Sequence, residues 1–165
     1  MRQPPTAFAR LAERHRPEIE RYLGRLLGND ADAQDACQET FLRAQRAFAR
    51  LVPGSNARAW LYRIATNSAR NAARGRSRRS ARIADVELDG LPAAPTASPE
   101  DRMQLRSVAR AAEALPPRQR AALVLRQFQD LGYAEIAATL GGTEATARAN
   151  VYQALKKLRS TLGGE

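Results

Sequence analysis

Residues 56–82 read NARAWLYRIATNSARNAARGRSRRSAR, and the pattern of this stretch decides how the rest of the chain is interpreted. At about 100° per residue, its apolar side chains fall on one side of a helical wheel. These side chains are Ala57, Trp60, Leu61, Ile64, Ala65 and Ala72. The opposite side carries Arg63, Asn67, Arg70 and Arg74. The spacing predicts a helix that buries one face and presents arginine and asparagine on the other.

Arginine dominates the segment around this helix. No Asp or Glu occurs between Glu39 and Asp85, whereas the same segment contains eleven arginines. Because a solvated face usually mixes both signs of charge, the gap favours a polyanionic partner over an arginine-rich surface that is merely soluble. Asn67 supports this choice, since an amide can hydrogen-bond to a base edge whereas arginine alone mostly contacts phosphate.

The composition narrows the class of protein. A length of 165 residues suggests one domain or two small ones, and a net charge of +10 favours a nucleic-acid partner. No apolar run reaches the ~18 residues of a spanning helix, and the N-terminus lacks an apolar signal core, so we expect a cytoplasmic protein without membrane insertion. The single cysteine, Cys37, and the single histidine, His15, exclude an intrachain disulfide and a usual Cys/His zinc site. We expect no metal and no cofactor, and interpret both residues as packing residues.

Apolar residues recur at helical spacing along most of the chain, and no stretch alternates apolar and polar residues at period two. The predicted fold class is therefore all-α. The expected helices cover residues 6–27, 32–51, 56–82, 99–115, 118–128, 133–140 and 144–162. Pro17 interrupts the first of them, which predicts a kink or two abutting helices.

Most of these helices have a candidate core stripe, as two of them illustrate. The stripe of helix 32–51 consists of Cys37, Phe41, Ala44, Phe48 and Leu51. The stripe of helix 99–115 consists of Leu105, Val108, Ala109 and Ala112. Both sets repeat at the three- and four-residue spacing of a helix that buries one side.

Segment 83–98 differs in composition from its neighbours. Arginine and serine give way to acidic residues and then to Gly, Pro and Ala with little to bury. This composition is typical of a linker. We therefore expect two small helical domains, residues 1–82 and 99–165, joined by a flexible linker over 83–98.

The second half contains a short helix, a turn at Gly141 and Gly142, and a longer helix that Thr143 is placed to N-cap. This order is typical of a helix-turn-helix, in which the second helix enters the major groove of DNA. Its outward face would carry Thr146, Arg148, Asn150, Tyr152, Gln153, Lys156 and Lys157. An ordinary helical hairpin in a bundle is the alternative, and the charged and amide-bearing outer face favours the DNA-binding interpretation.

Three blocks of the sequence resemble one protein family. They are residues 35–44 (DACQETFLRA), residues 59–67 (AWLYRIATN), and residues 114–137, which begin ALPPRQR and end YAEIA. In content, order and spacing they are similar to the extracytoplasmic-function (ECF) sigma factors of the sigma-70 family of bacterial RNA polymerase. The resemblance covers nearly all of residues 6–162.

The resemblance implies roles for particular residues. The first domain would dock on the clamp of the polymerase β′ subunit through Asp35, Gln38, Glu39 and Arg43. By the same resemblance, this domain would bind and melt the minus-ten promoter element through Trp60, Arg63 and Asn67. Arg70 and Arg74 share the polar helix face with Asn67, so we include them in this predicted surface. By the same resemblance, the second domain would read the minus-thirty-five element through Arg126, Arg148, Tyr152 and Gln153. Asn150 and Lys156 lie on the same outward helix face, so we include them in this predicted surface.

The resemblance also implies partners. These are core RNA polymerase (its β′ clamp and β flap), promoter DNA and an anti-sigma factor. The sequence departs from the family at Ala149 and Asn150, where a hydroxyl residue and an arginine are more frequent, and in loop 51–56, which lacks acidic and aromatic residues.

Two other functions compete with this one. A free-standing helix-turn-helix repressor or activator would bind duplex DNA without polymerase, usually as a dimer, but gives the block around Trp60 no role. An enzyme would need a carboxylate cluster, a GxxxxGK[ST] loop, or a nucleophile beside a base, and the sequence shows none of them. We expect no catalytic residues.

Overall fold

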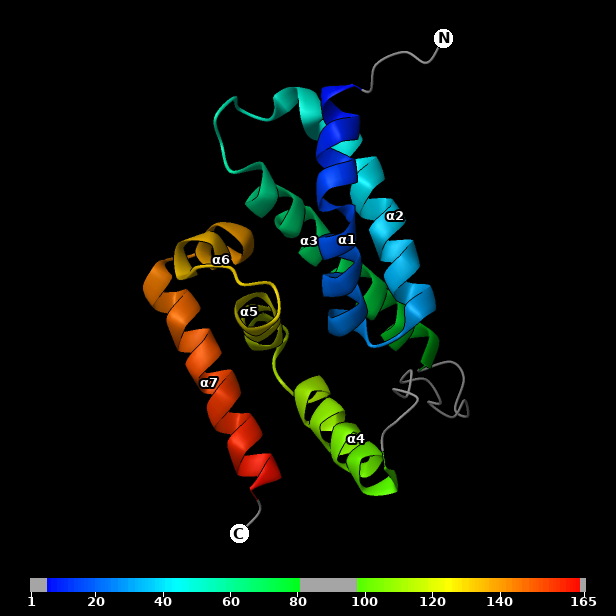
Figure 1. The fold of residues 1–165 in the computed structure, drawn as a ribbon, viewed down its shortest axis with the longest axis vertical. Helices are drawn as coiled ribbons and strands as arrows, with labels where there is room; N and C mark the ends of the chain where they lie inside the picture. The colour runs from blue at the N-terminus through cyan, green and yellow to red at the C-terminus, as the bar shows by residue number, and fades with distance from the viewer. Residues whose placement is uncertain (1–5, 81–97, 164–165) are drawn as a thin grey trace. The chain divides into compact units, whose positions relative to one another are not determined.

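The computed structural model describes residues 6–80 and 98–163 of the chain. All regular structure within these ranges is helical, so the predicted all-α class is confirmed (Figure 1). The chain divides into two compact units, Met1–Ala84 and Asp85–Glu165. Residues 83–97 of the predicted linker lie outside the described ranges.

The first unit consists of α1 (Ala7–Leu27), α2 (Asp30–Ala47), a short 3₁₀ turn (Phe48–Arg50) and α3 (Ala57–Ser80). The three α-helices pack against one another. The second unit consists of α4 (Pro99–Glu113), α5 (Pro117–Gln127), α6 (Tyr133–Leu140) and α7 (Glu144–Leu162). In this unit α7 packs on α4, α5 and α6.

Helix α1 is one helix and not two abutting ones, despite Pro17. The hydroxyl of Thr6 accepts a hydrogen bond from the Ala9 amide at 3.1 Å, and Gly28 ends the helix in the left-handed region at φ 65°. Pro17 is exposed, so water can solvate the carbonyl that loses its intrahelical partner. Buried residues on both sides of Pro17, such as Ala12 and Ile19, hold the helix in the unit.

Helix α2 begins two residues earlier than predicted, because the Asn29 side chain caps it by accepting a hydrogen bond from the Asp32 amide at 3.1 Å. The helix ends at Ala47, and Phe48 and Leu51, expected in the core, are only half-buried. Cys37 is 4% exposed and packs in the core as expected.

The buried face of α3 differs from the predicted one. Leu61 and Ala65 are buried as expected, but Trp60 and Ile64 are only half-buried. The face extends instead over polar residues and their neighbours, namely Tyr62, Thr66, Ser68 and Ala69. A hydropathy pattern treats tyrosine and threonine as polar, whereas here their hydroxyls find partners inside the unit.

A hydrogen-bonded column of side chains joins α1 to α3. The hydroxyl groups of Tyr22 and Thr66 lie 2.8 Å apart, and Thr66 donates to the backbone carbonyl of Tyr62 at 2.7 Å. The rings of Tyr22 and Tyr62 meet edge to face, with centroids 5.2 Å apart. Both tyrosines are fully buried, and burial raises the pKa of each phenol well above its ordinary range.

Glu18, on α1, accepts the hydrogen bond of the Tyr62 hydroxyl and so ends this column. Its carboxylate accepts hydrogen bonds from Arg58 Nη2 at 2.9 Å and from the Tyr62 hydroxyl at 2.9 Å, and it lies 2.5 Å from Nδ1 of His15. Partial burial raises the pKa of Glu18, but the hydrogen bonds from Arg58, His15 and Tyr62 outweigh that effect, so the pKa lies below its ordinary value of 4.5. His15 therefore has a structural contact, in keeping with its interpretation as a packing residue.

The second unit contains the predicted helix-turn-helix. Gly132 precedes α6 and donates its amide to the Glu135 carboxylate at 3.0 Å. Gly141 and Gly142 adopt positive φ angles of 76° and 110° between α6 and α7, a conformation that favours glycine. The Thr143 hydroxyl then caps α7 by accepting from the Thr146 amide at 3.2 Å.

The predicted core stripe of α4 is wrong for two residues. Leu105 is 57% exposed and Val108 is 42% exposed. Within the unit α4 packs on α7, and burial is confined to the end of α4 and the turn after it, at Ala111 and Leu115. The amphipathic pattern of α4 is real, but the described part of its own unit covers only one end of it.

We expect Glu18→Gln to destabilise the first unit by about 1–3 kcal/mol at neutral pH, since the amide loses charge-assisted hydrogen bonds. Because the pKa of Glu18 is lowered in the folded state, its contribution is present above 4.5 and is lost as the pH falls through and below that value. The difference in free energy of unfolding between wild type and variant should therefore shrink as the pH is lowered. Urea unfolding followed by circular dichroism, from neutral pH to below 4.5, measures this difference. A difference that does not change with pH would contradict the stabilising role of the Glu18 carboxylate.

Candidate nucleic-acid interface

The face of α3 opposite the core carries Arg63, Asn67, Arg70 and Arg74, and all four side chains are exposed. They follow one another at spacings of four, three and four residues, so they form a single row along the helix. Among residues 6–80 and 98–163, none of these four side chains makes a hydrogen bond or an ion pair. The row is thus a polar, positively charged surface whose donors are available to a ligand.

Trp60 and the loop before α3 lie at one end of this row. Trp60 is half-buried, so part of its ring stays accessible. In the loop, Ser55 donates its hydroxyl to the Val52 carbonyl at 2.6 Å, and Asn56 caps α3 by accepting from the Ala59 amide at 2.9 Å. These bonds hold Val52 with 68% of its surface exposed, a feature that sequence patterns did not single out.

Other arginines of the acid-free segment are bound within the fold. Arg58 donates to Glu18, and Arg76 donates from Nε to Asp32 at 2.8 Å and from Nη2 to the Leu27 carbonyl at 3.3 Å. Glu18 and Asp32 lie outside the acid-free segment in sequence but beside its arginines in the fold. The excess of positive charge in this segment is therefore smaller in the folded unit than in the sequence. The exposed row of α3, and not every arginine of the segment, is therefore the surface that favours a polyanion.

The outer face of α2 carries the residues expected to dock on a protein partner. Asp35, Gln38 and Arg43 are exposed, and Glu39 is half-buried and accepts from Arg43 Nε at 2.5 Å. Leu42 lies among them and is 42% exposed, which adds an apolar side chain that the sequence prediction omitted.

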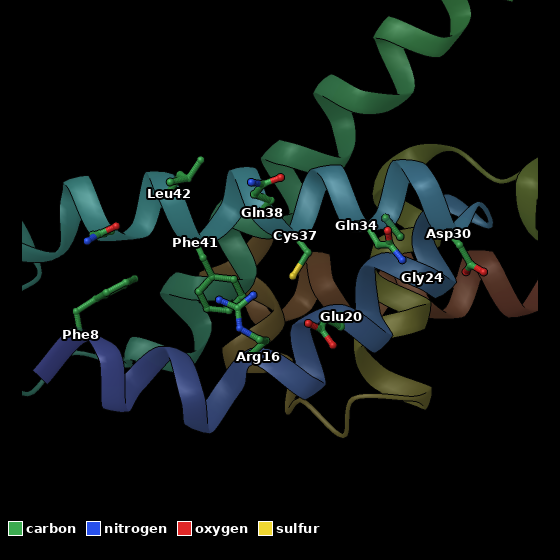
Figure 2. Close-up of a pocket in the computed structure, with 12 residues that line it drawn as sticks. Phe8, Arg16, Glu20, Gly24, Asp30, Gln34, Cys37, Gln38, Phe41 and Leu42 are labelled. Carbon is green, nitrogen blue, oxygen red and sulfur yellow. The ribbon is translucent and has the colours of Figure 1, made fainter. Parts of the chain in front are cut away.

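A groove of about 620 Å³ runs beside this face, between α1 and α2 (Figure 2). The Arg16 guanidinium lies 4.4 Å from the centre of the Phe41 ring inside it. Cys37 also lines the groove, but burial and then the charge of Glu20 raise the pKa of its thiol, so it stays protonated. Gln38 and Leu42 belong both to the groove and to the outer face of α2, which makes the two surfaces continuous.

The outward face of α7 presents most of the expected side chains. Arg148, Tyr152, Gln153 and Lys156 are exposed, and Asn150 is half-buried. Arg126 comes from the last turn of α5, is half-buried, and donates Nη1 to the Leu131 carbonyl at 3.1 Å.

Tyr133, the first residue of α6, connects two of these arginines. The guanidinium carbon of Arg126 lies 4.6 Å from the centre of the Tyr133 ring, and that of Arg148 lies 4.3 Å from it. Sequence reasoning missed this role. The three residues lie on three different helices, and no spacing rule predicts which of them meet.

Comparisons with known proteins identify the family of this chain. The family model described as Sigma-70 region 2 matches residues 11–79, and the one described as Sigma-70, region 4 matches residues 105–158. RNA polymerase sigma factor CarQ of Myxococcus xanthus is 34% identical over 157 residues, which cover 95% of this chain and 90% of that protein. ECF RNA polymerase sigma factor SigE of Mycolicibacterium smegmatis is 35% identical over 155 residues, covering 92% of this chain and 60% of that protein. The chain belongs to the ECF sigma factors of the sigma-70 family.

Two solved structures share the fold of this sigma factor. RpoE of Bartonella quintana, solved in complex with the anti-sigma factor NepR, superposes with a TM-score of 0.75 at 23% identity and covers 96% of this chain and 98% of that chain. CnrH, solved with the cytosolic domain of CnrY, superposes with a TM-score of 0.72 at 24% identity, covering 96% and 89%.

Membership in this family settles the class of function. The protein is an RNA polymerase sigma factor that directs transcription initiation, and it is not an enzyme. The free-standing repressor or activator is therefore set aside. In the described part of the chain no helix is long and apolar enough to cross a membrane, and no three metal-binding side chains gather there.

The different surroundings of Arg74 and Arg76 predict a loss of stability when Arg76 is replaced and almost none when Arg74 is replaced. We expect Arg76→Ala to lower the free energy of unfolding of the first unit by about 1 kcal/mol, because Asp32 and the Leu27 carbonyl lose a donor. This loss corresponds to a Tm lower by ~4–8 °C. Arg74→Ala is the matched control and should stay within about 0.5 kcal/mol of wild type, since Arg74 is exposed and outside any ion pair of the described residues. Thermal unfolding followed by circular dichroism measures the stability of both variants. Equal losses of stability would show that Arg76 holds the fold no more than Arg74 does.

Proposed function

We propose that each of the three surfaces has a separate binding role in the sigma factor. The outer face of α2 binds core RNA polymerase, the exposed row of α3 binds and melts the minus-ten element, and α7 reads the minus-thirty-five element. The observation that carries this proposal is the row of Arg63, Asn67, Arg70 and Arg74, which is exposed and makes no hydrogen bond or ion pair with the described residues. On this proposal residues 1–82 and 99–165 are the functional domains, and residues 83–98 link them.

The α2 face suits a protein partner of mixed polarity. It combines carboxylates at Asp35 and Glu39, an amide at Gln38, a guanidinium at Arg43 and the exposed apolar side chain of Leu42. Interfaces commonly surround a small apolar centre with polar groups that make hydrogen bonds. The clamp of the β′ subunit is the proposed partner of this face.

The α3 row suits a strand that is being separated from its complement. Arg63, Arg70 and Arg74 can neutralise phosphates without regard to sequence, whereas Asn67 offers both a donor and an acceptor to a base edge. Trp60, with its half-accessible ring at the end of the row, can stack on an exposed base. Unstacking a base costs a few kcal/mol, and such contacts offset that cost.

The α7 face suits the major groove of duplex DNA. Arg148 can donate to a guanine edge and Gln153 to an adenine edge, while Lys156 can contact phosphate. Tyr152, 61% exposed, adds an apolar contact, and Arg126 and Asn150 lie at the margins of the face. The same unit would contact the β flap of the polymerase.

One further partner and a cellular location follow from the proposed role. RpoE of Bartonella quintana is bound by the anti-sigma factor NepR in its solved structure, and we extend control by an anti-sigma factor to this chain. A protein that works with core polymerase on promoter DNA acts in the cytoplasm.

The docking face is tested by the double substitution Gln38→Ala/Glu39→Ala. The fold should survive, because Glu39–Arg43 is an exposed pair of the i,i+4 type that contributes about 0.3–0.5 kcal/mol. Affinity for core polymerase should fall at least about tenfold, since hydrogen bonds and charge are lost from the centre of the face. Fluorescence anisotropy with labelled full-length chain and core enzyme measures this, in the absence of DNA.

Asn71→Ala is the matched control for this experiment, because it removes an exposed amide from α3 and leaves α2 intact. It should assemble with the polymerase like the wild type. Unchanged assembly by the double variant would remove α2 from the docking surface.

The melting surface is tested by comparing Asn67→Ala with Arg74→Ala. Loss of Asn67 should weaken opening by about 1–3 kcal/mol and only on some minus-ten sequences, as expected for a base contact. Loss of Arg74 should weaken all promoters by a similar factor and reduce the salt dependence, as expected for a phosphate contact. Permanganate footprinting of thymines on a panel of minus-ten variants distinguishes the two. A sequence-dependent loss for Arg74→Ala with a uniform one for Asn67→Ala would reverse the assigned roles.

A further inference from the structure

The ring of Tyr133 joins three helices of the second unit. Tyr133 begins α6, Arg126 reaches it from the last turn of α5, and Arg148 reaches it from α7. Both guanidinium carbons lie within 4.6 Å of the ring centre, well inside the distance at which a cation is attracted to the face of an aromatic ring. One side chain thus sets the positions of two arginines that belong to the proposed minus-thirty-five surface.

These contacts hold the arginines without neutralising them. Arg126 has one further hydrogen bond, from Nη1 to the Leu131 carbonyl, and across residues 98–163 neither arginine forms an ion pair with a carboxylate. A carboxylate in place of the ring would fix the same side chains but would cancel their charge and occupy their N–H groups. An aromatic ring contacts the flat face of a guanidinium and leaves the N–H groups at its edge available to a DNA phosphate or base.

We infer that Tyr133 is a positioning residue for DNA reading, which preorganises Arg126 and Arg148 through the face of its ring. A free arginine side chain loses much rotamer freedom when it binds, and a side chain that is already held loses less. Tyr133 therefore raises affinity for the minus-thirty-five element through the two arginines that it holds. The inference rests on the proposed function of α7.

The chain offers a clean pair of substitutions. The Tyr133 hydroxyl has no hydrogen-bond partner within the described residues, so Tyr133→Phe removes nothing that the fold uses and keeps the ring face. Tyr133→Leu keeps an apolar side chain at this half-buried position but removes the ring. Thermal unfolding of both full-length variants shows whether the unit stays folded.

Binding is measured with holoenzyme reconstituted from the full-length chain and core RNA polymerase. The probe is a promoter found by sequencing transcripts that this holoenzyme makes from genomic DNA, with its minus-thirty-five element intact or scrambled. Tyr133→Leu should weaken binding about five- to thirtyfold on the intact promoter and less than about twofold on the scrambled one. Tyr133→Phe should stay within about twofold of wild type on both.

A background of Arg126→Ala/Arg148→Ala separates positioning from general structure. If Tyr133 acts through the two arginines, Tyr133→Leu should cost no more than about twofold in that background. An undiminished loss there would show a merely structural role and overturn the inference, as would a Tyr133→Phe loss equal to that of Tyr133→Leu.

The same variants distinguish this inference from the proposed function. If Arg126→Ala/Arg148→Ala weakens binding to the intact element but Tyr133→Leu does not, the positioning role is overturned and α7 keeps its place at the DNA. If Arg126→Ala/Arg148→Ala binds intact and scrambled promoters like the wild type, the minus-thirty-five surface itself is wrong, and the positioning role fails with it.

Discussion

The carboxylate of Glu18 anchors α3 to α1, and the orientation of the exposed row of α3 depends on that anchor. Arg58 and Tyr62, both from the first turns of α3, donate to it, and the Tyr22–Thr66 pair continues the same contact one turn further along. Hydrogen bonds have directional requirements that apolar contacts lack, so this column fixes the rotation of α3 about its own axis. Once that rotation is set, the opposite side of the helix must face outward.

Arginine serves two different purposes in the first unit, and the surroundings of each side chain decide which. Arg58 and Arg76 donate to carboxylates on α1 and α2 and hold the helices together. Arg63 and Arg70 have the same chemistry but lie on the outer side of α3, away from the carboxylates of the described fold. The division lets a very basic unit keep a stable core while it offers a concentrated positive surface to a polyanion.

In the second unit an aromatic ring holds two arginines in place. There the ring of Tyr133 replaces the carboxylate as the group that holds Arg126 and Arg148. Attraction to an aromatic face is weaker than a buried ion pair but leaves the charge intact. If this surface binds DNA as proposed, keeping the charge matters more than the strength of the internal contact.

The sequence by itself determined the all-α class, the positions of most helices and the helix-turn-helix, because capping residues, glycine turns and helical spacing act over a few neighbouring residues. Thr143 illustrates this, since its hydroxyl caps α7 as its position in the chain predicted. Only the tertiary structure decided that Tyr62 is buried, that Arg76 pairs with Asp32, and that Leu105 stays exposed. These outcomes depend on partners dozens of residues away or on other helices, and local periodicity contains no information about which distant side chains meet.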